Sequence, residues 1–325
     1  MKNRGNLTKP LALAVLLLFL ILLPLFVRGY WLDVLILLTI NVILVVSFRL
    51  VTTMGGWNFA HIAMMGVGAY TSALLTTKYL DWPFWLTLPL GGLVAAFVAL
   101  AISYPCLRTK GFYFFLSTFA AGEAMRQVWI RFQFFGGKYG ICPIIHPNPI
   151  LGIEFVRAVP NYYLALVITL LSVFIFYRLD KSRIGDTVKA INSDEELCEA
   201  MGINTWGYKA LVFVVASFFA GIAGVLLVHY NGLINAEAFS VAYCYKIITA
   251  TIIGGAATFV GPIIGLVVMT GVTEIFRDLL EWVPLIYGVF IIGVLLFLPD
   301  GLVTLPRRMS PLIKKIQMIG KGIAR

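Results

Sequence analysis

Long apolar runs alternate with short polar segments along this chain, and most of the runs are long enough to cross a membrane as helices. A spanning helix needs roughly 20 mainly apolar residues, because the hydrocarbon core of a bilayer is about 30 Å thick. The pattern predicts spans over residues 11–27, 31–51, 59–77, 84–104, 112–130, 162–177, 210–230, 239–253, 260–275 and 284–298. These runs lack the period-two alternation of outer-membrane strands, so we expect an all-α helical bundle.

Two regions leave the number of crossings between about eight and ten. The first run follows Lys2, Arg4 and Lys9, as in a signal peptide, but Arg28 comes directly after it and no small-residue cleavage site is present. We therefore expect a retained first helix. Residues 254–262 are rich in glycine and form either a re-entrant hairpin buried in protein or a connection between two spans.

The composition supports a polytopic membrane protein. Hydrophobic residues make up 60% of the 325 residues and charged residues only 12%, with a mean hydropathy of +0.94. A soluble globular domain is about a quarter charged. We expect a single transmembrane domain over residues 1–306, which includes a polar segment over 180–209, and a basic cytoplasmic tail over 307–325.

The positions of Lys and Arg orient the chain by the positive-inside rule, with both termini in the cytoplasm. The tail contains six cations and no acid, so anionic lipid explains the net charge of +10 better than nucleic acid does. Some cations disagree with this orientation because the alternation of spans places them near the outer side. These are Arg126, Arg131, Lys138 and Arg157.

The segment 180–209, DKSRIGDTVKAINSDEELCEAMGINTWGYK, is the longest charge-dense stretch between two apolar spans. Asn192 or Ser193 can cap a short helix whose first turn carries acids, and Gly202 can end it. Such a helix at the membrane face is either a docking element for a partner or a solvated loop. The spacing alone leaves both interpretations open.

Motifs for catalysis are missing from the sequence. It contains no GxxxxGK[ST] phosphate loop and no metalloprotease, nucleophile-elbow or kinase motif. The three histidines, His61, His146 and His229, are far apart in sequence, and the four cysteines show no paired metal-ligand spacing. We therefore expect no enzyme activity, no metal site and no cofactor in this chain.

Polar side chains inside apolar spans are costly, so each is a candidate for a translocation path or an internal pair. Asn58 and His61 begin the third span, where a polar cavity or a satisfied helix end is equally plausible. Glu123 and Arg126 lie three residues apart on one helix face and can pair, either along a path or only to fix packing. Lys246 begins the eighth span and can extend to the membrane interface.

Small residues mark the predicted helix contacts. Glycine lets the backbones of two membrane helices approach closely. The candidate packing positions are Gly66, Gly68, Gly221, Gly224, Gly254, Gly255 and Gly261.

Several segments resemble the inner-membrane permease subunits of bacterial branched-chain amino acid ABC importers, specifically the longer of the two permeases. The resemblance rests on FAHIAMMGVGAYTSALL (59–75), LRTKGFYFFLSTFAAGEAMRQV (107–128), IGDTVKAINSDEELCEAMGINTWGYKALVFVVASFFAGIAGVLLVH (184–229), IIGGAATFVGPIIG (252–265) and LFLPDGL (296–302). Related permeases for urea and short amides share these motifs. The resemblance therefore implies the transporter class more firmly than the solute.

The resemblance implies a cytoplasmic coupling helix that fits a cleft in an ATPase subunit. By position the coupling contacts are Lys189, Ala190, Asn192, Glu195, Glu199, Ala200, Gly202 and Asn204. Family members usually carry Arg where Asp186 and Asn192 stand, Glu where Ser193 stands, and an acid where Lys246 stands. The docking face of this chain is thus less basic than the family pattern.

The implied assembly contains a shorter homologous permease, two cytoplasmic ATPase subunits that bind ATP and Mg²⁺, and a periplasmic solute-binding protein. A different class, an ion-coupled secondary transporter working through Glu123 and His61, would not need the exposed helix of the polar segment. A non-transporting assembly or receptor subunit is a third alternative.

Overall fold

The computed structural model describes residues 5–149, 155, 157–277, 285, 288, 289, 292, 293, 296 and 301–304. Its helices, in chain order, are α1 (Gly5–Phe26), α2 (Tyr30–Thr52), α3 (His61–Ala73) with a π-helical extension η1 (Leu74–Tyr79), α4 (Phe84–Cys106), α5 (Phe112–Arg131), η2 (Gln133–Phe135), η3 (Gly137–Tyr139), α6 (Ala158–Asp180), α7 (Arg183–Ser193), α8 (Glu195–Ala200), α9 (Thr205–Asn231), η4 (Ala236–Phe239), α10 (Val241–Gly254), α11 (Gly261–Ile275) and η6 (Leu302–Thr304).

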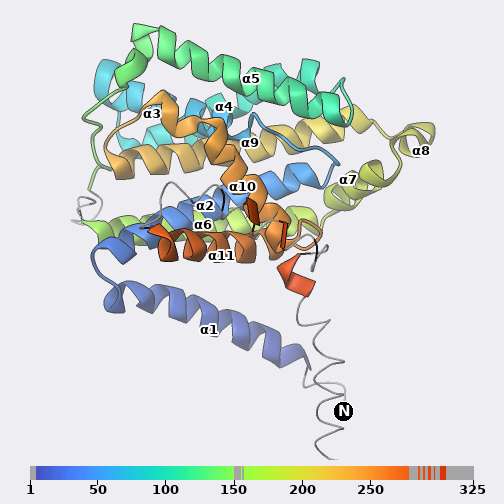
Figure 1. Ribbon diagram of the computed structural model, residues 1–325, viewed down its shortest axis with the longest axis horizontal. Coiled ribbons are helices and arrows are strands. Elements are labelled where there is room, and N and C mark those ends of the chain that lie inside the picture. The colour runs from blue at the N-terminus through green and yellow to red at the C-terminus, as the bar shows by residue number, and fades with distance from the viewer. Residues whose placement is uncertain are drawn as a thin grey trace, which may run out of the picture.

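The expected all-α bundle is confirmed, because each predicted span up to residue 275 coincides with a helix in Figure 1. Five helical segments of the described chain are long and apolar enough to cross a membrane: α2, α4, α6, α9 and the segment Ala236–Gly254. The predicted span 284–298 lies mostly outside the described residues.

The helix α9 is the centre of the bundle and packs against α2, α3 and α4. Glycine makes this packing close. A Cβ atom added at Gly68 would collide with the backbone of Gly221, and one added at Gly224 would collide with the carbonyl oxygen of Met65. Two helices can approach to this distance only where side chains are absent from the contact, which is the common use of glycine in membrane bundles.

The other predicted packing glycines lie at two further contacts. A Cβ at Gly66 would meet the ring of Trp129 from α5. Gly254 and Gly261 face each other where α10 meets α11, and Gly255 has a φ of 96° that turns the chain between these helices.

The backbone is irregular between α9 and α10, over residues 232–240. Gly232 ends α9, and η4 then packs the ring of Phe239 against Trp129, with ring centroids 5.8 Å apart. The hydroxyl of Tyr243, at the start of α10, donates to Oδ1 of Asn41 at 2.6 Å. Since Asn41 lies midway along α2, α10 begins halfway through the bundle, where packed protein can cover irregular backbone.

The connection over residues 255–260 lies instead at the end of the bundle. The Nε atom of Arg49, in the last turn of α2, donates to the carbonyl oxygen of Ala256 at 3.2 Å. A re-entrant hairpin at residues 254–262 is therefore the wrong interpretation. The chain instead runs from the Asp33 end of α2, through residues 232–240 and α10, to the Arg49 end.

The helices α7 and α8 project from one end of the bundle (Figure 1). The start of α1 lies toward this same end in Figure 1, and Gly301, just before η6, lies against Gly254 and Gly255 there.

Candidate functional site

The polar segment folds as two short helices, and a capping side chain marks the start of each one. The hydroxyl of Ser182 accepts from the N–H of Gly185 and caps α7. The carboxylate of Asp194 accepts from the N–H of Leu197 at 2.9 Å and caps α8. The expected cap at Asn192 or Ser193 is therefore wrong, because both residues lie in the last turn of α7.

The helix α8 ends as the glycine pattern indicated. Gly202 has a φ of 79°, a left-handed conformation that favours glycine, and its N–H donates to the carbonyl oxygen of Glu199. Asn204 then caps α9 by accepting from the N–H of Gly207 at 3.0 Å. We call α7 and α8 together, residues 183–200, the α7–α8 hairpin.

A buried ion pair fixes the base of the α7–α8 hairpin. The Nη1 atom of Arg49 on α2 lies 3.0 Å from Oδ1 of Asp180 at the end of α6, and both side chains are almost fully buried. Lys189 of α7 lies 3.2 Å from the same carboxylate and donates to the carbonyl oxygen of Asp180 at 2.9 Å. Through Asp180, α2, α6 and α7 are joined by charge-assisted contacts.

A second set of ion pairs joins α8 to the bundle. The Oε1 atom of Glu195 accepts from Nζ of Lys209 on α9 at 2.6 Å, and its Oε2 atom lies 3.3 Å from Nζ of Lys110. Burial of the Glu195 carboxyl acts to raise its pKa, but the two ion pairs outweigh burial and hold the pKa below its ordinary value. Glu195 therefore joins the hairpin to the bundle.

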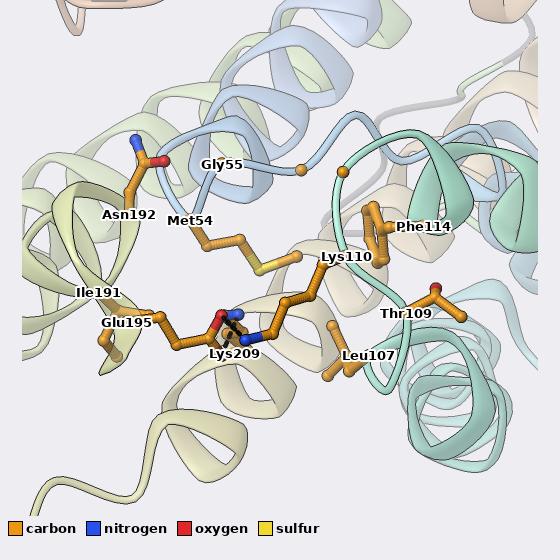
Figure 2. A pocket seen from close by; sticks show the side chains of 12 residues that line it. Met54, Gly55, Leu107, Thr109, Lys110, Phe114, Ile191, Asn192, Glu195 and Lys209 are labelled. Carbon is orange, nitrogen blue, oxygen red and sulfur yellow. Dashed lines mark hydrogen bonds and ion pairs between the residues drawn. The ribbon is translucent and has the colours of Figure 1, made fainter. Parts of the chain in front are cut away.

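Figure 2 shows the pocket beside Glu195, where the side chains of Lys110, Glu195 and Lys209 converge between the hairpin and the bundle. The pocket has a volume of about 190 Å³. Its other walls come from the ends of α2 and α4, the start of α5 and the end of α7: Met54, Gly55, Gly56, Leu107, Thr109, Gly111, Phe114, Ile191 and Asn192. The pocket lies between the hairpin and the ends of the bundle helices, and the ion pairs of Glu195 cross it.

The structure divides the predicted coupling residues into two groups. Lys189 and Glu195 are half-buried and turn toward the bundle. The others are exposed on the α7–α8 hairpin and its exit: Ala190, Asn192, Glu199, Ala200, Gly202 and Asn204. Of these, Glu199 also accepts a 2.7 Å hydrogen bond from the hydroxyl of Thr205.

Two apolar side chains of the hairpin region are absent from the predicted set. Leu197 is 57% exposed and Met201 is 72% exposed. They lie four residues apart and so share one side of the helical turn. The signal that could have identified them is this apolar pair within an otherwise acidic helix.

The polar pair at the start of α3 does not form an open cavity. Oδ1 of Asn58 accepts from the N–H of Ala60, and Nε2 of His61 lies 3.0 Å from the hydroxyl oxygen of Ser47 on α2. Both side chains are fully buried. Among the described residues, Nδ2 of Asn58 and Nδ1 of His61 have no hydrogen-bond partner.

Glu123 and Arg126 pair as their spacing indicated, and two further residues join them. Nε and Nη2 of Arg126 donate to the two carboxylate oxygens of Glu123 at 2.9 and 2.7 Å, and Gln127 donates to the same carboxylate. Nη1 of Arg126 donates to Glu237 of η4 at 3.0 Å. Through Glu237, the segment between α9 and α10 contacts α5.

Lys246 is half-buried on α10, one turn after Tyr243. Since α10 begins halfway along α2, Lys246 lies near the middle of the bundle, and its extension to the membrane interface stays a prediction. The candidate path residues thus do not form one cluster: within the described part of the chain, Glu123 and Arg126 meet, whereas His61 contacts Ser47 instead.

The described residues contain no group of three or more His, Cys, Asp or Glu side chains that could hold a metal ion. The free cysteines there are Cys106, Cys142, Cys198 and Cys244, of which only Cys142 is exposed.

The chain is similar to known membrane permeases over most of its length. Residues 30–299 match the family described as branched-chain amino acid transport system / permease component. The high-affinity branched-chain amino acid transport system permease protein LivM is 29% identical in Salmonella typhimurium and 28% in Escherichia coli K12, over 83% of this chain and 67% of the relative. LivH of Escherichia coli K12 is 27% identical over 77% of this chain and 86% of the relative.

No solved structure matches this chain. The family match extends from the start of α2 past α11, so it covers the bundle, the α7–α8 hairpin and the Glu123–Arg126 pair together. The chain therefore belongs to the branched-chain amino acid transport system permease family, as a multi-pass permease subunit of an ABC importer that resembles the longer, LivM-type subunit.

Proposed function

We propose that this chain forms half of the path by which an ABC importer moves branched-chain or similarly apolar amino acids across the bacterial inner membrane. The names of the relatives support this solute class. In this assembly a shorter, LivH-like permease forms the other half, and a periplasmic binding protein delivers the solute. Two cytoplasmic ATPase subunits bind ATP and Mg²⁺, for which this sequence has no phosphate loop.

The observation that carries the proposal is the construction of the α7–α8 hairpin. Its outer side is exposed, with Leu197 and Met201 among its acids, while its inner side is tied to α2, α6 and α9 by the ion pairs of Asp180 and Glu195. A docking element that transmits motion needs both properties. When the ATPases close on the hairpin, these ties pass the displacement to the bundle and rock it between outward and inward states.

The proposed orientation places the α7–α8 hairpin in the cytoplasm, together with both termini. The start of α1 and Gly301 lie toward the hairpin end of the bundle, which supports this arrangement. The positive-inside rule supports the same orientation, through Arg49, Arg108 and Lys110.

The test is co-purification of this chain with its partner permease and ATPases, followed by ATPase and leucine-uptake assays in lipid, with and without binding protein. We expect ATPase stimulation that disappears in Met201→Asp, because a charge would then lie at the apolar docking contact. The control is Lys181→Gln, an exposed residue just before the hairpin. Uptake without ATPases, driven by an ion gradient, would indicate a secondary transporter, and uptake of urea in place of leucine would indicate an amide permease.

A further inference from the structure

A continuous stripe of side chains runs along one face of α5 and changes from aromatic to charged. Phe115, Phe119 and Glu123 are spaced four residues apart and so share that face. Phe59 packs edge-on against Phe115, with ring centroids 4.4 Å apart. The ring centroid of Tyr245, on α10, lies 5.9 Å from that of Phe59, and Tyr245 is 56% exposed. We call Phe59, Phe115, Phe119 and Tyr245 the aromatic cluster.

Arg126 lies next to Glu123 at the charged end of this stripe, and its guanidinium group donates hydrogen bonds to two carboxylates. Its Nε and Nη2 atoms donate to the carboxylate of Glu123, in a partly buried pair. Its Nη1 side reaches Glu237, whose side chain is 71% exposed. An ion pair with a partner exposed to this degree contributes little to stability, so Glu237 can be displaced at little cost.

A packing role explains only part of this arrangement. Glu123 alone neutralises Arg126, as an ion pair that fixes helix packing requires. The segment between α9 and α10 adds a second carboxylate, Glu237, which that neutralisation does not require. Glu123, Arg126 and Glu237 together therefore carry one net negative charge. The Nη1 side of Arg126 and the carboxylate of Glu237 can separate from each other.

We propose that Arg126 and Glu237 bind the zwitterionic head of an amino acid in passage, while its apolar side chain lies on the aromatic cluster. The carboxylate of the solute takes the Nη1 side of Arg126, and its ammonium group is bound by the displaced Glu237. Glu123 keeps the guanidinium in place through its two hydrogen bonds. Binding a zwitterion leaves the net charge of the cluster unchanged.

This inference rests on the proposed function and narrows its solute class. Urea and short amides have no carboxylate for Arg126 and no ammonium group for Glu237, so this site favours amino acids over them. A cavity of about 20 Å³ lies beside Glu123 and Phe119, which is room for about one water molecule. The passage is therefore closed here, and the solute would pass along the exposed side of α5 and α10, where the second permease completes the path.

The test uses the full complex in proteoliposomes, with leucine uptake and binding-protein-stimulated ATPase measured in parallel. Arg126→Lys keeps the charge that pairs with Glu123 but removes the planar fork. We expect leucine uptake to fall by about tenfold, as for one lost charge-assisted hydrogen bond, with ATPase activity retained. The matched control is Arg131→Gln on the same helix, an exposed cation outside the cluster, and it should transport as the unmodified complex does.

Glu237→Gln is the second variant, because it removes an exposed carboxylate and leaves the Glu123–Arg126 pair intact. We expect it to assemble normally and to lose leucine uptake by a similar factor. Unchanged leucine uptake in Glu237→Gln, or in a well-assembled Arg126→Lys complex, overturns the inference. Failure of the proposed function has a different signature, since the unmodified complex itself would then not take up leucine.

Discussion

Arg49 on α2 and Asp180 at the end of α6 form a buried ion pair, 3.0 Å apart, at the point where the α7–α8 hairpin leaves the bundle. The two residues are 131 positions apart in the chain. Arg49 also donates to the carbonyl oxygen of Ala256, so the connection between α10 and α11 is tied to the same pair. Any motion of the hairpin therefore acts on α2, α6 and the α10–α11 connection together.

The first prediction concerns this pair. Arg49→Met should lower the melting temperature in detergent, because removing one partner of a buried pair costs about 3–5 kcal/mol. The loss should lie at the lower end of that range, since Lys189 still neutralises Asp180. The measurement is a double-mutant cycle with Asp180→Asn, followed by thermal unfolding. Additive losses in the cycle would show that the two residues do not act as a pair.

The second prediction concerns the turn that ends α8. Gly202→Val should reduce ATPase coupling in the assembled complex, because a β-branched residue is strained at a φ of 79°. The space around Gly202 is open, so the effect comes from the backbone and not from a clash. Gly202→Asn is the matched control, since asparagine tolerates this conformation. Equal ATPase activities for the two variants would contradict the explanation.

The third prediction concerns the contact between α3 and α9. Gly224→Ala should destabilise the bundle by about 1–3 kcal/mol, because the added methyl group would collide with the carbonyl oxygen of Met65. Gly271 is exposed and lies within α11, away from its ends. A Cβ atom added there has no neighbour within 4 Å, so Gly271→Ala should be neutral or slightly stabilising. Thermal unfolding of both variants in the same detergent is the measurement. A Gly224→Ala protein as stable as the Gly271→Ala control would refute the close contact.

The fourth prediction concerns pH. The pKa of Glu195 is lower in the folded chain than its ordinary value, so its ion pairs stabilise the hairpin above about pH 4.3, the value of a free Glu side chain. That stabilisation is lost as the pH falls through the depressed pKa. Hydrogen exchange of the α8 amides should therefore accelerate on acidification more in the unmodified chain than in Glu195→Gln.

The comparison with Glu195→Gln isolates this carboxyl from other acids of the hairpin, such as Asp194 and Glu199, which both proteins contain. Identical pH profiles for the two proteins would mean that Glu195 does not hold the hairpin.

The sequence by itself determined the membrane class, the positions of the helices up to residue 275 and the presence of a polar segment with a glycine stop. These features are local, because span length, caps and the i, i+3 spacing of Glu123 and Arg126 depend only on neighbouring residues. The family resemblance, which the match over residues 30–299 confirmed, also came from contiguous motifs.

Only the tertiary structure decided which polar groups meet across the fold. It turned Lys189 and Glu195 inward, although their neighbours on the hairpin are exposed. It also brought Glu237 to Arg126 across 111 positions, because η4, which follows Gly232, packs against α5. No local pattern encodes such contacts, since they depend on how deeply α10 starts beside α2 and on the packing of α9 against its neighbours.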